Sequence, residues 1–151
     1  MIRRLFPTAA LAAVALAIAG CSKSPPPIVP VEGRVTLNGK PLPNAEVRFY
    51  PMIAFGGEYI AIGETDDDGR FKLACPAGAG ACACECRVTV TEAPLPDGFR
   101  GMSADAQAKA AKYQNSMKNR PIPPQYANLA LSPLKIDVSA DRKDYDFALT
   151  R

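Results

Sequence analysis

Hydrophobic and polar residues alternate with a period of two along most of the chain after residue 30, a pattern typical of short β-strands with one buried face. Between the alternating segments lie turn signals, such as Asn38-Gly39 and the Asp-rich residues 66–69. The chain therefore predicts an all-β fold, a seven-stranded antiparallel β-sandwich of the Ig-like kind. The seven predicted strands lie at 31–37, 47–50, 58–65, 71–75, 88–90, 134–138 and 145–149.

One segment departs from this alternation and predicts a short helical insert near residues 103–118. Ser103 is a suitable N-cap, and Asp105 suits the positive end of a helix dipole. Apolar residues then recur at helical spacing. We expect this stripe to pack on the sandwich, with a partner-binding role as the alternative. The stripe consists of Ala106, Ala110, Tyr113 and Met117.

The N-terminal segment predicts an exported lipoprotein. Arg3 and Arg4 precede twelve residues without a polar side chain, 9–20. A membrane-spanning helix needs roughly 20 apolar residues, so this run suits a signal peptide better. Residues 18–21, Ile-Ala-Gly-Cys, resemble a lipobox, the recognition site of the lipoprotein signal peptidase. We therefore expect residues 1–20 to be removed and Cys21 to carry lipid; an ordinary secretory signal is the alternative.

The residues after Cys21 predict how the domain is held. Residues 21–30 are rich in proline and favour an extended tether, which places the domain, residues 31–151, away from the bilayer. Ser22 stands where an Asp would resemble an inner-membrane retention signal. We therefore expect a lipid-anchored protein of the cell envelope, in the outer membrane rather than the inner one. Envelope proteins or glycans are its candidate partners.

Composition argues against nucleic-acid binding and against catalysis. The chain has 18 basic and 15 acidic residues, and removal of Arg3 and Arg4 leaves 16 against 15. This balance lacks the basic face that nucleic acid requires. No histidine is present, so a Ser–His or Cys–His nucleophile is impossible. We expect no enzyme and no cofactor.

Four cysteines form the most individual feature of the domain: Cys75, Cys82, Cys84 and Cys86. In an exported protein they are candidates for disulfides. If residues 82–86 are extended, their three sulfurs share one face and neighbouring bridges of the Cys-x-Cys type are strained. We expect Cys75 to be cross-linked across the hairpin, with its partner open. Free buried thiols, or a thiolate site for zinc or copper(I) or for redox chemistry, are the alternatives.

Two further groups of side chains are weaker candidates. Asp66, Asp67 and Asp68 could ligate calcium, but no Glu lies at the spacing of an EF-hand loop, and Asp-rich turns need only local hydrogen bonds. Exposed aromatic rings could stack on sugars. The aromatic candidates are Tyr50, Tyr59 and Tyr126.

Several segments resemble a known family of domains. Residues 31–51, together with 65–73 (TDDDGRFKL), resemble the opening of carboxypeptidase-regulatory-like, transthyretin-like domains. Residues 122–126, 132–134 and 144–149 resemble the end of short bacterial lipoproteins that carry this domain. The resemblance implies a transthyretin-like β-sandwich without a peptidase zinc site, and its motifs concern structure more than function. We expect a non-catalytic binding or structural role, with a thiol-based metal-binding or redox lipoprotein as the alternative.

Overall fold

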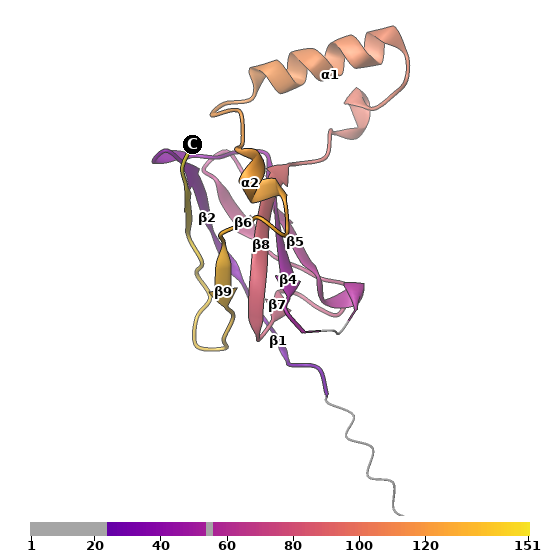
Figure 1. The fold of residues 1–151 in the computed structure, drawn as a ribbon. Helices are drawn as coiled ribbons and strands as arrows, with labels where there is room; N and C mark the ends of the chain where they lie inside the picture. The colour runs from indigo at the N-terminus through magenta and orange to yellow at the C-terminus, as the bar shows by residue number, and fades with distance from the viewer. Residues whose placement is uncertain (1–23, 54–55) are drawn as a thin grey trace, which may run out of the picture.

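The structure of the chain is a computed structural model, and it describes residues 24–53 and 56–151. The predicted signal peptide and the predicted lipid site at Cys21 lie outside the described residues. The described chain is predominantly β and has several antiparallel sheets (Figure 1). Its strands are β1 (Ile28–Val29), β2 (Glu32–Leu37), β3 (Lys40–Pro41), β4 (Ala45–Pro51), β5 (Ala61–Glu64), β6 (Arg70–Lys72), β7 (Ala81–Cys82), β8 (Glu85–Glu92), β9 (Lys135–Asp137) and β10 (Phe147–Leu149). The helices are α1 (Ala104–Ser116) and α2 (Pro124–Ala127).

The strands form two larger sheets and one small one. One sheet has the order β5-β4-β8-β9 and is antiparallel throughout. In the other, β2 pairs with β3 and β6 antiparallel and with β10 parallel. Strands β1 and β7 form the small sheet. The prediction of a fully antiparallel arrangement is therefore wrong for β10, because the last strand runs along β2 in the same direction.

Local turn chemistry explains how the strands are joined. Asn38 and Gly39 have φ values of 52° and 76°, and two successive positive φ angles make the type of turn that closes a two-residue hairpin. The carboxylate of Asp66 accepts hydrogen bonds from the backbone N–H groups of Asp68 (2.9 Å) and Arg70 (2.8 Å). Both predicted turns are confirmed.

The two larger sheets share one core, in which aromatic rings from both meet. The ring of Phe49 on β4 lies edge-on to Phe71 of β6 (6.4 Å between centroids) and to Phe147 of β10 (5.9 Å). Val47 and Val88 are fully buried in the same cluster. Edge-to-face pairs are favourable beyond the apolar area they bury. The alternation predicted for β4 is confirmed, since Val47 and Phe49 face inward.

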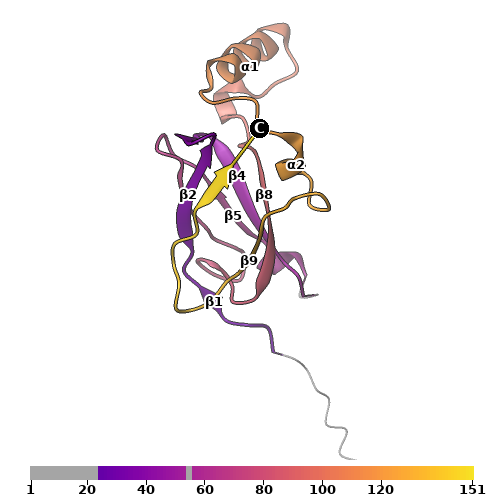
Figure 2. The ribbon, with the colours of Figure 1, turned by 60° about the vertical axis from the view of Figure 1, so that its left-hand side comes forward.

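Helix α1 forms where it was predicted, but it does not pack on the sheets. The Ser103 side chain accepts the N–H of Ala106, which confirms the cap. No residue of the helix is buried, and Figures 1 and 2 show it standing off one end of the sheets. Its Tyr113 ring lies 4.8 Å from that of Phe99, in a 3₁₀ turn at Asp97–Phe99. The residues of the predicted stripe are half-buried, and the contact of Tyr113 with Phe99 covers part of it.

Neither helix spans a membrane: within the described ranges, no helix is both long enough and apolar enough to do so.

Candidate functional site

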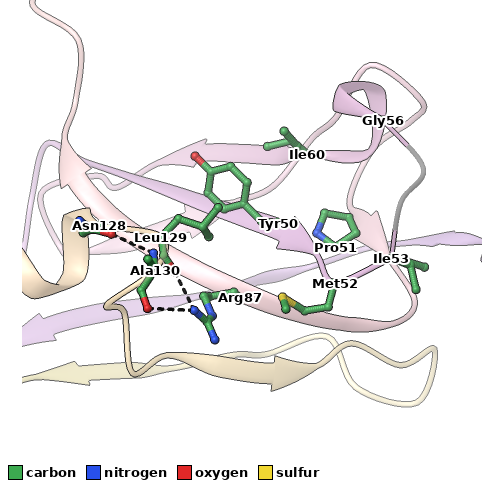
Figure 3. A pocket seen from close by; sticks show the side chains of 10 residues that line it. All are labelled: Tyr50, Pro51, Met52, Ile53, Gly56, Ile60, Arg87, Asn128, Leu129 and Ala130. Atoms are coloured by element: carbon green, nitrogen blue, oxygen red, sulfur yellow. Dashed lines mark hydrogen bonds between the residues drawn. The ribbon is translucent and has the colours of Figure 1, made fainter.

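An open groove lies on the outer face of the β5-β4-β8-β9 sheet. Tyr50 pairs with Arg87 across β4 and β8, and each follows or precedes a fully buried residue of its strand, so both side chains point away from the core. The groove has a volume of about 800 Å³. Its lining consists of Tyr50, Pro51, Met52, Ile53, Gly56, Ile60, Arg87, Asn128, Leu129 and Ala130 (Figure 3).

One wall of the groove is a turn that follows α2 and is held in place by Arg87. A guanidinium N–H of Arg87 donates to the carbonyl oxygens of Leu129 (3.0 Å) and Ala130 (3.1 Å). The side chain of Asn128 accepts the N–H of Ala130 at 2.8 Å, which closes the turn from inside. The wall is thus fixed by hydrogen bonds from Arg87 and Asn128.

The surface that the groove offers is mainly apolar. Met52, Leu129 and Ile53 are 50%, 41% and 39% exposed and line the same groove, so they form one apolar patch. Arg87 is the charged residue of the lining, and its Nε is buried without a partner in the described part of the chain. The arrangement suits an apolar or amphipathic ligand. Among its lining residues there is no carboxylate, thiol or hydroxyl nucleophile other than the Tyr50 phenol.

A cluster of cysteines lies beside one end of this groove. Strand β7 ends at Cys82 and β8 begins at Glu85, so the chain reverses in between. The N–H of Cys84 donates to the carbonyl of Cys82 at 2.9 Å, a three-residue turn. The Sγ atoms of Cys84 and Cys86 are 3.9 Å apart. Residues 82–86 are therefore not extended throughout, because a tight turn precedes β8, and the strain expected of Cys-x-Cys bridges in an extended segment does not apply to Cys84 and Cys86.

The other two sulfurs of the cluster point to backbone oxygens. The thiol of Cys75 donates to the carbonyl of Gly78 at 3.5 Å, and the thiol of Cys82 donates to the carbonyl of Pro26 at 3.6 Å. All four cysteines are free thiols here. The predicted cross-link of Cys75 stays a prediction for the protein in an oxidising compartment.

Burial controls the acidity of three of these thiols. It raises the pKa of Cys82, Cys84 and Cys86 to about 11 each. All three are therefore protonated near neutral pH, and only a thiolate attacks disulfides or binds metals. Within residues 24–53 and 56–151, no group of three or more cysteine or acidic side chains has the geometry to hold a metal ion.

The remaining candidates from the sequence have different surroundings. The carboxylate of Asp66 already accepts the two backbone hydrogen bonds of the turn described above. Tyr50 lines the groove. Tyr126 was expected to be exposed but is 5% exposed, and its hydroxyl donates to the carbonyl of Thr150 at 3.2 Å, so it anchors α2 instead of offering a ring to a sugar.

The groove itself was not predicted from the sequence. The available signal was the apolar pair Met52-Ile53 directly after a strand, together with Leu129 and Leu131 in a turn. Met52 and Ile53 are adjacent and so break the alternation that marks the core, and exposed apolar side chains of this kind often mark a contact surface.

The chain matches no protein-family model, no curated protein and no solved structure.

Proposed function

We propose that this chain is a lipid-anchored protein of the bacterial cell envelope, with a non-catalytic binding or structural role. The observation that carries the proposal is the position at which the predicted tether enters the domain. The proline-rich residues 24–27 lead into β1, at the end opposite α1 (Figure 1). The carbonyl of Pro27 accepts the N–H of Ala83 at 2.9 Å, so the tether is attached directly beside the cysteine turn. A lipid on Cys21 would hold the domain by this end.

The finer fold that we propose is the transthyretin-like sandwich of carboxypeptidase-regulatory-like domains. Three observations support it: the hairpin at Asn38-Gly39, the Asp-rich turn at 66–69, and two sheets that share a core around Phe49. Such folds carry many functions, so the role must be argued from the site.

The apolar groove is the contact surface in this proposal. It lies next to the tethered end, because Pro51 pairs with Cys86 and the N–H of Met52 donates to the carbonyl of Glu85 at 2.9 Å. A ligand of envelope origin, a protein segment or a glycan with an apolar face, fits its chemistry. The outer membrane is the proposed location.

Replacing Cys21 with Ala tests the anchoring. The variant should be released from membranes, since the lipid is then absent and stable anchoring requires acyl chains. Fractionation of cells followed by a high-salt wash and immunodetection provides the measurement. Ser22→Ala is the matched control and should remain in the membrane fraction. Retention of Cys21→Ala in washed membranes would overturn the lipoprotein proposal.

A second candidate function is thiol-based metal binding or redox chemistry. It is favoured by the Sγ separation of 3.9 Å between Cys84 and Cys86. Thiol counting and metal analysis on protein purified from the envelope separate the two candidates. Four thiols with stoichiometric metal would favour metal binding, and four metal-free thiols that oxidise and are reduced again reversibly would favour redox chemistry. Metal-free protein whose thiols do not change favours the first proposal.

A further inference from the structure

The turn between β7 and β8 changes which cysteines can be joined. A Cys-x-Cys bridge is strained when both residues lie in one extended strand, because their side chains are nearly parallel. Here Cys84 lies in the turn, with its N–H on the carbonyl of Cys82, and Cys86 is the second residue of β8. Their sulfurs are 3.9 Å apart. A disulfide is about 2.05 Å long, so the two atoms need to approach by only about 2 Å.

The remaining sulfurs have other contacts. Cys75 donates to Gly78 and Cys82 donates to Pro26, each of them to a backbone oxygen outside the pair. Cys86 also approaches the carbonyl of Cys82, but at 4.0 Å. The side chains of Cys82 and Cys84 also interact. The thiol of Cys82, however, is directed to the carbonyl of Pro26, whereas the sulfurs of Cys84 and Cys86 face each other at 3.9 Å. We therefore take Cys84 and Cys86 as the pair best placed for a covalent bond.

We propose that Cys84 and Cys86 form an intramolecular disulfide in an oxidising compartment. The oxidant is a disulfide, either a small molecule such as oxidised glutathione or the oxidised form of a dithiol oxidoreductase. Two S–H bonds of the protein and the S–S bond of the oxidant break. One S–S bond forms between Cys84 and Cys86, and the oxidant leaves as two thiols that carry both protons and both electrons. This inference depends on the proposed function in one respect: export brings the protein into a compartment that holds the oxidant.

Exposure sets the order of the two steps. Cys84 is partly exposed whereas Cys86 is fully buried, so the oxidant meets Cys84 first. The thiolate of Cys84 attacks it to give a mixed disulfide, and Cys86 then displaces the leaving thiol. Since burial raises the pKa of both thiols, oxidation should accelerate as the pH rises from neutral toward 10.

If Cys84 and Cys86 are joined, the partner left for Cys75 is Cys82. The predicted cross-link of Cys75, whose partner the sequence leaves open, would then close residues 75–82.

Peptide mapping of the purified full chain tests the pairing. The protein is incubated with oxidised glutathione, alkylated and cut with trypsin, which releases residues 73–87 with all four cysteines. Cleavage after Glu85 then separates Cys86 from the others, so the fragment joined to 86–87 identifies its partner by tandem mass spectrometry. We expect Cys84. Any other partner for Cys84 or Cys86, such as a Cys82–Cys84, Cys75–Cys86 or Cys82–Cys86 bridge, or alkylation of both Cys84 and Cys86, would overturn the proposal.

Two matched double variants give an independent test. Cys75→Ser with Cys82→Ser retains only the proposed pair and should reach the oxidised form at a rate similar to that of the native chain. Cys75→Ser with Cys84→Ser retains Cys82 and Cys86 and should oxidise at least tenfold more slowly. The reverse order of rates would contradict the assignment. If a variant fails to fold, the peptide map of the native chain still decides the pairing. The fractionation of Cys21→Ala is unaffected by either result.

Discussion

At the scale of single residues, Asn119 binds the segment that returns from α1 to the first hairpin of the sheets. Its side-chain amide donates to the carbonyl oxygens of Leu37 (3.0 Å), Lys40 (3.1 Å) and Pro41 (3.2 Å). These carbonyls belong to the first hairpin, about eighty positions earlier in the sequence. Its φ of 59° lies in the left-handed region, which Asn tolerates better than most residues. Both properties point to a structural role.

Replacing Asn119 with Ala should lower the free energy of unfolding by about 1–3 kcal/mol, because backbone carbonyls of the hairpin lose their donor. Chemical denaturation followed by circular dichroism provides the measurement. Asn115→Ala is the matched control: Asn115 is exposed on α1, and its loss should change the free energy by less than ~0.5 kcal/mol. Equal effects of the two substitutions would show that the contacts of Asn119 contribute little.

The sequence predicted burial well wherever it depends on local alternation. Phe49 and Tyr50 face opposite sides of β4 because successive residues of a strand do so. The predicted exposure of Tyr126 is wrong because the partner of its hydroxyl, Thr150, lies 24 positions away in the sequence. The groove residue Arg87 was missed for the same reason, since its contacts with Leu129 and Ala130 depend on how α2 returns to the sheet.

At the scale of elements, α1 is an appendage. Its N-terminus was predictable because Ser103 caps it locally, but an amphipathic stripe does not specify the surface that it meets. That surface is Phe99 and not the core. The cysteine turn was likewise unpredictable, since the alternation of Cys82, Cys84 and Cys86 continues into β8 and hides the reversal.

Replacing residues 102–116 with a short Gly-Ser linker should leave the domain folded, because no residue of α1 is buried. We expect cooperative unfolding with a free energy within ~1 kcal/mol of the native chain. Thermal unfolding monitored by circular dichroism checks this. A deletion extended through Asn119 is the informative comparison and should be clearly less stable. Loss of cooperativity in the shorter deletion would show that α1 supports the core.

At the scale of the whole molecule, the features outside the core gather at two ends. Strand β1 lies at one end of the sheets and α1 stands at the other (Figures 1 and 2). The turn between β7 and β8 is joined to the start of the described chain, since the N–H of Ala83 donates to the carbonyl of Pro27, and Met52 of the groove follows it through its bond to Glu85. This arrangement could not be predicted, because it depends on long-range pairings such as that of Phe147 with Val35. Such pairings are set by the packing of whole sheets and leave no local pattern in the sequence.

The groove predicts that the native domain binds an amphipathic anion. Anilinonaphthalene sulfonate combines apolar rings, which match Met52 and Leu129, with a negative group for the side of Arg87. It becomes fluorescent on apolar protein surface. Met52→Ser combined with Leu129→Ser should reduce the fluorescence of the bound dye severalfold. Met102→Ser is the matched control: Met102 is 94% exposed at the α1 end, and its replacement should have little effect.

The comparison works because both methionines are exposed, whereas only Met52 lines the groove. A single exposed side chain offers a dye no concave surface, whereas the groove provides apolar walls from β4 and from the turn after α2, held by Arg87. Denaturation curves of the variants establish that each is folded at the temperature of the titration. If the double variant binds the dye as the native chain does, or if Met102→Ser abolishes binding, the groove is not the apolar contact surface of this domain.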